Sequence, residues 1–237
     1  TDFEKSLINP NYYELQFFSK EIKVENPRLW FPLGLGEPFL YKVEVKMYCN
    51  GVLCDSHEFM TGIRIFESGR TAGEKYRTRW EDFRFSVNGQ DFFLKGMNWT
   101  PIDYLYDINP DEYEWLLTLA KNAGIQLLRV WSGGGMPETD TFYELCDKLG
   151  IVVWQDHMIA NTNATQSFPQ DILESQEAYN IYRIRNHPSL VIHCGGNEFL
   201  PYSINNASSM FVIDRTVRTL DPSRIFHYTT ADKGSAH

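Results

Sequence analysis

Asn197 and Glu198 are the neighbouring side chains of this sequence with the clearest capacity for chemistry. A carboxyl group can give and take a proton, and an adjacent amide can hold a hydroxyl group by hydrogen bonds. The pair follows residues 190–194, a short apolar run typical of a strand buried on both faces. Ligands of parallel α/β proteins bind beyond the carboxyl ends of the strands, so the pair is predicted to lie at a binding site. The alternative is that it only begins a loop or caps a helix.

Polar and aromatic side chains also follow three earlier apolar runs. They are Asn98, Trp99 and Asp103 after the first run, Arg129 and Trp131 at the end of the second, and Trp154, Gln155, Asp156 and His157 at the end of the third. The interior of a (β/α)8 barrel prefers Val, Ile and Leu, so polar groups gathered at one end of four strands indicate a site. Carboxylates, amides, an arginine and tryptophans suit a sugar, whose hydroxyls both donate and accept hydrogen bonds and whose ring faces stack on indoles.

Each of these side chains has a structural alternative. Arg129 could pair with Glu198 only for stability, Trp154 could belong to the core, and a lone histidine such as His157 is often a satisfied loop residue. His193 falls inside an expected strand, so a place in the core or behind the site is expected for it.

A regular alternation of strand and helix patterns begins near residue 92. Expected strands start near residues 92, 125, 151, 190 and 225, and the first of them covers residues 92–96. The helix patterns between them are predicted near residues 110–123, 142–149, 171–185 and 207–220, the last with Phe211 in its buried stripe. This rhythm is typical of a (β/α)8 barrel or a doubly wound sheet, and the first strand lacks the G-x-G-x-x-G turn of a dinucleotide fold. A barrel needs about 250 residues, so residues 83–237 would supply its first part only.

Residues 1–82 have the alternating and apolar runs of β structure, at residues 12–18, 39–48 and 53–66. Asn50-Gly51 predicts a hairpin turn, and Asn88-Gly89 predicts a second one between residues 83–87 and 92–94. Residues 69–80 are polar and without periodicity, as in a linker. The sequence therefore predicts two domains, an antiparallel β-sandwich over residues 1–82 and the start of an α/β domain over residues 83–237.

Composition excludes several classes of partner. The chain has 237 residues and a formal net charge of −9 without a basic run, which argues against nucleic acid and anionic membrane surfaces as partners. No run of about 18 apolar residues is present, so no membrane-spanning helix is expected. No cysteine and histidine spacing of a zinc site occurs, and neither a metal nor a cofactor is expected. The chain begins with Thr1 and contains glycosylation triplets, which favours a periplasmic or secreted location over a cytoplasmic one.

The four cysteines are too few and too scattered for a disulfide framework. Cys146 and Cys194 lie in apolar patterns and are expected to be buried thiols. A two-residue turn at Asn50-Gly51 would pair Cys49 with Val52, which leaves Cys54 out of register for a direct bridge.

Taken together, the motifs resemble family 2 glycoside hydrolases, in particular the β-mannosidase-like branch that also contains exo-β-glucosaminidases. The matching segments span most of residues 20–200. They are Asn26-Pro27-Arg28-Leu29-Trp30, Gly62-Ile63-Arg64, Leu94-Lys95-Gly96-x-Asn98-Trp99-x-Pro101-x-Asp103, Arg129-Val130-Trp131-x-Gly133-Gly134-Gly135, Val153-Trp154-Gln155-Asp156, and Arg185-Asn186-His187-Pro188-Ser189-Leu190 through Asn197-Glu198.

The resemblance implies an immunoglobulin-like β-sandwich followed by an incomplete (β/α)8 TIM barrel, and a retaining β-glycosidase as the whole protein. Glu198 would be the general acid/base, and Asn197 would hydrogen-bond the sugar's 2-hydroxyl. Arg129 and Asp103 would hold the sugar or orient a second carboxylate, and Trp131 would form a wall of the subsite. Asn98, Asp156 and His157 complete the expected substrate-binding set for a β-linked oligosaccharide or glycoside.

The exact sugar stays open between β-mannoside and the alternatives β-glucosaminide, β-galactoside and β-glucuronide. Related β-mannosidases tend to carry an aromatic residue where this chain has His157, and tryptophan is common at the position of His193.

The sequence departs from the family at the nucleophile. Retaining chemistry needs a second carboxylate about 5–5.5 Å from the first. No glutamate follows Glu198, and only Asp214, Asp221 and Asp232 remain. We therefore expect the nucleophile to lie outside this chain and the isolated chain to be inactive. Its open sheet edges and helix faces would favour self-association, for instance as a homo-oligomer, or partial disorder near residues 200–237.

Two other classes of function fit the residues. One is a carbohydrate-binding protein without catalysis, and the other is a lyase or aldolase that uses Glu198 as a base. A lyase would more often show a metal-ligand cluster or a catalytic lysine on a strand, and Lys95 is the only candidate for such a lysine.

Overall fold

The computed structural model describes residues 21–69, 84–103, 105, 107–131, 133, 137–160, 169–201, 203 and 206–230. The expected strand at residues 12–18 and the linker from residue 70 to residue 80 lie outside these residues.

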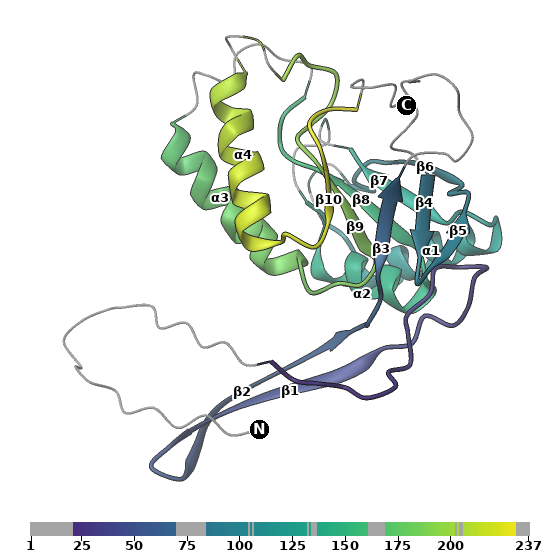
Figure 1. Cartoon of the computed structure of the whole chain (residues 1–237), viewed down its shortest axis with the longest axis vertical. Coiled ribbons are helices and arrows are strands. Elements are labelled where there is room, and N and C mark those ends of the chain that lie inside the picture. The colour runs from purple at the N-terminus through teal and green to yellow at the C-terminus, as the bar shows by residue number, and fades with distance from the viewer. Residues whose placement is uncertain are drawn as a thin grey trace.

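A parallel sheet of five strands forms the centre of the structure (Figure 1). Its strands are β6 (Gly96–Trp99), β7 (Leu127–Val130), β8 (Val152–Asp156), β9 (Leu190–Cys194) and β10 (Ile225–His227). Every strand pairs in parallel with the strand that precedes or follows it along the chain. A doubly wound sheet reverses its strand order at the switch point, whereas this order has no reversal. The topology is that of the first five units of a (β/α)8 barrel.

Four helices connect these strands and pack on one face of the sheet. They are α1 (Pro110–Asn122), α2 (Asp140–Leu149), α3 (Gln170–Ile184) and α4 (Ala207–Leu220). Asn109 caps α1 by accepting a hydrogen bond from the Asp111 amide at 3.0 Å, as its side chain and the following proline predict. Gly150 ends α2 with φ of +74°, a left-handed conformation that glycine adopts without cost. In Figure 1, α3 and α4 lie side by side along the β9–β10 side of the sheet.

Two layers of apolar side chains fill the two faces of the sheet. On the helix side, Leu128, Val130 and Val153 pack against Tyr113 of α1 and Phe142 of α2. On the other face, Trp154, Ile192 and Cys194 meet a small antiparallel sheet of β3 (Phe66–Gly69), β4 (Arg84–Val87) and β5 (Gln90–Phe92). Since side chains alternate along a strand, Val153 of β8 lies in the first layer, and Val152 and Trp154 lie in the second.

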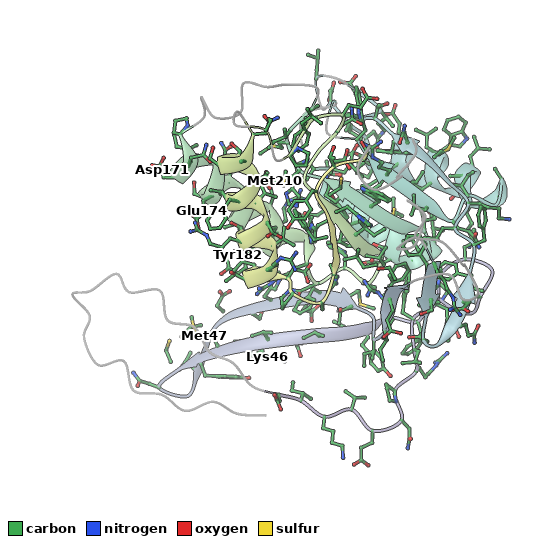
Figure 2. The ribbon with its side chains drawn as sticks, turned by 45° about the horizontal axis from the view of Figure 1, so that its top comes forward. Lys46, Met47, Asp171, Glu174, Tyr182 and Met210 are labelled. Atoms are coloured by element: carbon green, nitrogen blue, oxygen red, sulfur yellow. The ribbon has the colours of Figure 1, made fainter. Side chains whose placement is uncertain are left out.

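A long hairpin of β1 (Tyr41–Cys49) and β2 (Val52–Thr61) extends away from the barrel strands (Figure 1). Asn50 and Gly51 form its turn with φ of +52° and +78°, which confirms the predicted hairpin. The second predicted hairpin is confirmed at Asn88 and Gly89, with φ of +50° and +79°. Figure 2 shows Lys46 and Met47 on the long hairpin, whereas Met210 of α4 lies between that helix and the sheet.

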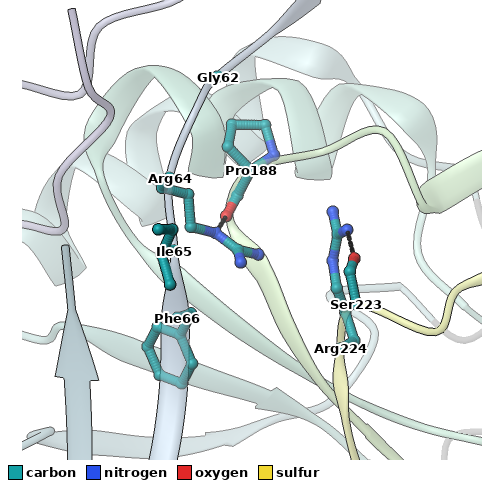
Figure 3. A pocket seen from close by; sticks show the side chains of 7 residues that line it. All are labelled: Gly62, Arg64, Ile65, Phe66, Pro188, Ser223 and Arg224. Atoms are coloured by element: carbon teal, nitrogen blue, oxygen red, sulfur yellow. Dashed lines mark hydrogen bonds between the residues drawn. The ribbon is translucent and has the colours of Figure 1, made fainter. Parts of the chain in front are cut away.

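The segment between β2 and β3 is hydrogen-bonded to the N-terminal end of β9. Arg64 donates hydrogen bonds to the carbonyls of Pro188, at 2.8 Å, and of Leu190. Burial, together with the charge of Arg224, lowers the pKa of Arg64 to about 9. Figure 3 shows Arg64 beside Pro188 and Arg224 beside Ser223, all of which line one cavity. The volume of this cavity is about 230 Å³. Because Leu190 is the first residue of β9, this cavity lies at the opposite end of the strand from Asn197 and Glu198.

Three expectations about the elements are wrong. The first barrel strand is Gly96–Trp99 and not residues 92–96, because Phe92 belongs to β5 and pairs with Phe85 of β4. The run 53–66 is broken, since β2 ends at Thr61 and β3 begins at Phe66. Phe211 is 65% exposed, because Val212 and Ile213 take the buried positions of α4 in its place.

The antiparallel β3–β4–β5 sheet joins strands from both sides of residue 82, so the domain division at that residue stays a prediction. None of the helices in the described ranges is both long enough and apolar enough to cross a membrane.

Candidate active site

The carboxyl ends of the five parallel strands bring five polar side chains into one hydrogen-bonded group. Asn98 comes from β6, Arg129 from β7 and Asp156 from the end of β8. Asn197 follows β9 and Thr230 follows β10. Asn98 and Arg129 are register neighbours, which places their side chains on the same face of the sheet. We call this set the Arg129 cluster.

Arg129 is the centre of the cluster. Its guanidinium donates to both oxygens of Asp156, from Nε to Oδ1 at 3.2 Å and from Nη2 to Oδ2 at 2.6 Å. It also donates from Nη2 to Asn197 Oδ1 at 2.7 Å and from Nη1 to Asn98 Oδ1 at 3.2 Å. Such a planar fork of donors matches a carboxylate bidentately, which lysine could not do.

The ion pair at the centre of the cluster is buried but charge-compensated, whereas Asn98 is exposed. Arg129 is 5% exposed and Asp156 is 1% exposed, so the guanidinium and the carboxylate neutralise each other away from water. Trp154 Nε1 donates a further hydrogen bond to Asp156 Oδ1 at 3.1 Å. A pair satisfied in this way fixes the direction of every side chain bound to it.

Asn197 is held on three sides. Its backbone N–H donates to the Ile159 carbonyl at 2.8 Å, and Thr230 Oγ1 donates to its Oδ1 at 3.3 Å in addition to the bond from Arg129. Since the amide oxygen takes both donors, the amide nitrogen must point elsewhere.

Gly195 and Gly196 allow this tight arrangement. A Cβ atom on Gly196 would lie 2.2 Å from the Ile159 carbonyl oxygen, and one on Gly195 would lie 2.5 Å from the Tyr228 carbonyl oxygen. The two glycines before the pair are therefore required for close packing of neighbouring chain segments.

Glu198 is exposed, in contrast to the buried Asn197 before it. Its backbone has φ of +48°, in the left-handed region that glutamate rarely adopts. Strained backbone of this kind often occurs at functional sites, where neighbouring structure holds it in place. An exposed carboxyl group directed by such a backbone, next to a fixed amide, can exchange protons with a bound molecule.

Two predicted site residues lie near the same strand ends with contacts of their own. Trp131 is half-buried, and its backbone N–H donates to the Trp99 carbonyl at 3.0 Å. Its indole covers Gly133, where a Cβ atom would come within 2.0 Å of the ring. Asp103 is half-buried and accepts a hydrogen bond from the Leu105 amide at 2.6 Å.

His157 is not brought into the Arg129 cluster. Its Nδ1 lies 2.5 Å from the carboxylate of Glu177 in α3, and its ring stacks on His193 at 5.2 Å between centroids. Because side chains alternate, Asp156 faces the cluster while His157 faces the helices. Its predicted role in substrate binding stays a prediction. His193 is fully buried and bonded to Asp221 at 3.0 Å, in agreement with its expected place behind the site.

The remaining acids after Glu198 have structural partners. Asp214 lies in α4 and pairs with Arg218 at 2.6 Å, and Asp221 lies at the end of α4 and bonds to His193. Asp232 lies outside the described residues.

Two buried polar residues of this region were not predicted from the sequence. Thr230 follows the last strand, and two consecutive threonines after an apolar run were the available signal. Glu138 is 1% exposed and accepts a hydrogen bond from Trp99 Nε1 at 2.8 Å. No periodicity marks Glu138, since it lies in the connection before α2.

Comparison with known proteins agrees with this architecture. The family model "Glycosyl hydrolases family 2, TIM barrel domain" matches residues 79–236, and the model "Glycosyl hydrolases family 2" matches residues 2–64. Beta-mannosidase B of Aspergillus terreus is 35% identical over 178 residues, which are 74% of this chain and 20% of that protein. Beta-mannosidase B of Aspergillus niger is 35% identical over 181 residues, covering 75% of this chain and 21% of that protein.

Solved structures give the same result. The β-D-mannosidase of Dictyoglomus thermophilum is 35% identical with a TM-score of 0.76, over 87% of this chain and 27% of that one. The exo-chitosanase CsxA of Amycolatopsis orientalis, at 19% identity and a TM-score of 0.69 over 86% of this chain and 23% of that one, shares the fold.

The chain spans about a fifth of the length of the β-mannosidases that it matches. The matches confirm the predicted fold class, a β-sandwich domain followed by an incomplete TIM barrel. On the match over residues 79–236, which is more than half of its length, this chain belongs to glycosyl hydrolase family 2.

Proposed function

We propose that this chain supplies the acid/base half of the active site of a retaining β-glycosidase with β-mannosidase-like specificity. The observation that carries the proposal is the position of Asn197 and Glu198. They follow the fourth barrel strand, with the amide bonded to the Arg129 cluster and the carboxyl group exposed beside it. The 35% identity to two fungal β-mannosidases supports mannose as the sugar.

In the proposed reaction, Glu198 first gives its proton to the glycosidic oxygen while a second carboxylate, outside this chain, attacks the anomeric carbon. The bond from that carbon to the glycosidic oxygen breaks and a glycosyl ester forms. Glu198, now a carboxylate, then takes a proton from water, which attacks the same carbon and releases the sugar.

The Arg129 cluster would orient the sugar for this reaction. Because Arg129 and Thr230 both donate to Asn197 Oδ1, the amide nitrogen of Asn197 is directed to donate to the sugar's 2-hydroxyl. We assign Asn98 and Asp156 to the support of Arg129, and Trp131 and Asp103 to the walls of the sugar subsite. His157 lies on the helix side of the sheet, behind Asp156, so we assign it an indirect role in substrate binding.

The test uses the whole protein and a panel of nitrophenyl β-glycosides. We expect the β-mannoside to be cleaved fastest, and fastest cleavage of the β-glucosaminide, β-galactoside or β-glucuronide would correct the sugar and leave the mechanism intact. Glu198→Gln should lower kcat/KM roughly 10²–10⁴-fold for alkyl glycosides, whose leaving groups need a proton. Dinitrophenyl glycosides should be affected less in the first step.

Azide provides the decisive measurement. It needs no base, so it should rescue the second step in Glu198→Ala and give a β-glycosyl azide. Glu174→Gln, a carboxylate of the outer helix α3 bonded to Arg215, is the matched control and should keep full activity. Unchanged activity in Glu198→Gln, or inversion of the anomeric centre by proton NMR, would refute the proposal. Binding of a β-mannoside without hydrolysis by the whole protein would favour a carbohydrate-binding protein.

A further inference from the structure

Cys49 and Cys54 lie at the tip of the long β1–β2 hairpin, and both are exposed free thiols. A regular two-residue hairpin would pair Cys49 with Val52 and place Cys54 two residues out of register with Cys49. The observed register differs, because Tyr48 pairs with Leu53 whereas Met47 pairs with Asp55. Cys54 is therefore the extra residue of a β-bulge, without a cross-strand partner of its own.

The bulge directs Cys54 back towards the turn. Its Sγ donates a hydrogen bond to the carbonyl oxygen of Val52 at 3.3 Å. Val52 is the residue directly opposite Cys49 in the hairpin. A side chain that reaches the backbone of Val52 thus reaches the position facing Cys49.

The effect of one thiol on the other agrees with this placement. A hydrogen bond with the Cys54 thiol raises the pKa of the Cys49 thiol. The two sulfur atoms are thus neighbours. Only Asn50, Gly51, Val52 and Leu53 separate the two cysteines in sequence.

We propose that Cys49 and Cys54 form a redox-active dithiol that closes to an intramolecular disulfide, with a low-molecular-weight disulfide such as oxidised glutathione as the oxidant. One protein thiolate attacks a sulfur of glutathione disulfide and releases the first glutathione. The second protein thiolate attacks the mixed disulfide and releases the second glutathione. The protein loses two electrons and two protons, and glutathione disulfide gains them. The cross-link would fix the hairpin tip.

The other two cysteines provide an internal control. Cys146 and Cys194 are buried, and burial raises the pKa of both thiols. Glutathione disulfide cannot reach a buried sulfur, so these two thiols should stay reduced while the exposed hairpin pair is oxidised.

The experiment treats the chain with oxidised glutathione at mildly alkaline pH and then counts thiols with Ellman's reagent. In the folded state, the two exposed thiols should react before oxidation and neither should react after it. In denaturant, four thiols should react before oxidation and only the two buried ones after it. Mass spectrometry should show that the tryptic peptide of residues 47–64, which contains both hairpin cysteines, loses two hydrogen atoms and carries no glutathione.

Two single variants keep the proposal falsifiable. Cys54→Ser and Cys49→Ser should each retain one glutathione as a stable mixed disulfide, because no second thiol is near enough to displace it. Two glutathione adducts on the wild-type peptide, a covalent dimer, or unchanged thiol counts would each overturn the proposal. Since the hairpin lies away from the Arg129 cluster, this result is independent of the proposed glycosidase function.

Discussion

The guanidinium of Arg129 and the carboxylate of Asp156 lie side by side at the ends of adjacent strands, joined by hydrogen bonds of 3.2 and 2.6 Å. Their side chains are 7% and 0% exposed, so neither charge can rely on water if the other is removed. This pair fixes Asn197, and through it the residue that carries the exposed carboxyl group.

Arg129→Met should lower the free energy of unfolding by about 3–5 kcal/mol, because it leaves the Asp156 carboxylate buried and unpaired. Arg215→Met removes an exposed arginine bonded to Glu174 and should cost at most about 1 kcal/mol. Urea unfolding of both variants measures the difference. Adding Asp156→Leu to Arg129→Met should recover much of the loss, and an equally destabilised double variant would contradict this account.

Asn88→Gly should destabilise the chain by about 1–2 kcal/mol, whereas Asn50→Gly should change stability by less than about 0.5 kcal/mol. Both asparagines occupy the same left-handed position of an Asn-Gly turn. Only Asn88 also joins two segments, since its Oδ1 accepts from the Ile65 amide at 2.9 Å and its Nδ2 donates to the Trp30 carbonyl at 3.0 Å. Thermal unfolding of the two variants compares them directly. Equal effects of the two substitutions would show that the two side-chain hydrogen bonds of Asn88 contribute nothing to stability.

Gly195→Ala should cost about 1–3 kcal/mol from overpacking, because its Cβ would meet the Tyr228 carbonyl oxygen at 2.5 Å and Met210 Cε at 2.4 Å. Gly69→Ala is the control, since no atom lies within 4 Å of a Cβ built there. In the whole enzyme, Gly195→Ala should also lower kcat, because Asn197 and Glu198 follow directly. A neutral Gly195→Ala in chemical denaturation would show that α4 can move away freely.

The chain should lose stability as the pH falls from about 6.5 to about 4, and His193 should cause part of the loss. Burial lowers the pKa of His193 from 6.5 to about 4, although its hydrogen bond with Asp221 opposes this and the neighbouring charges of His157 and Arg224 add to it. In this window the unfolded chain binds a proton at His193 that the folded chain does not. Stability therefore rises with pH across the window, by on the order of 3 kcal/mol in total.

His193→Gln tests this assignment, because glutamine keeps an N–H donor for Asp221 but does not titrate. The groups that face His193 are His157 after β8, with its partner Glu177 in α3, then Asp221 after α4 and Arg224 before β10. Urea unfolding at pH 7 and pH 5 should show a smaller difference for the variant than for the wild type. The same pH dependence in both proteins would assign the effect to other groups.

Periodicity and capping residues were sufficient to predict most of the barrel elements. Residues 190–194 form β9 with the expected bounds, and Asn109 and Pro110 begin α1 as expected. The first barrel strand was missed because local hydrophobicity favours residues 92–94, although Phe93 is 84% exposed. The true strand, Gly96–Trp99, has three exposed residues of four, so no apolar pattern marks it.

The site could be predicted in outline, because parallel strands deliver their carboxyl ends to one edge. This reasoning grouped Asn98, Arg129, Asp156 and Asn197, which the structure joins by hydrogen bonds. It did not anticipate the partner of His157, which is Glu177 on a helix 20 residues later. Long-range partner choice of this kind depends on how helices dock, which a single sequence does not reveal.

The unbroken succession of neighbouring strands has a consequence for biosynthesis. Each strand from β6 to β10 finds its partner among residues that have just left the ribosome, so the sheet can grow from one side without waiting for distant segments. The Arg129 cluster, in contrast, needs residues that are far apart in the sequence, since its members range from Asn98 to Thr230. At 5–20 residues per second, roughly 10 s separates the appearance of the first from that of the last. The sheet can thus begin to form before the polar centre, which is complete only once Thr230 has been synthesised.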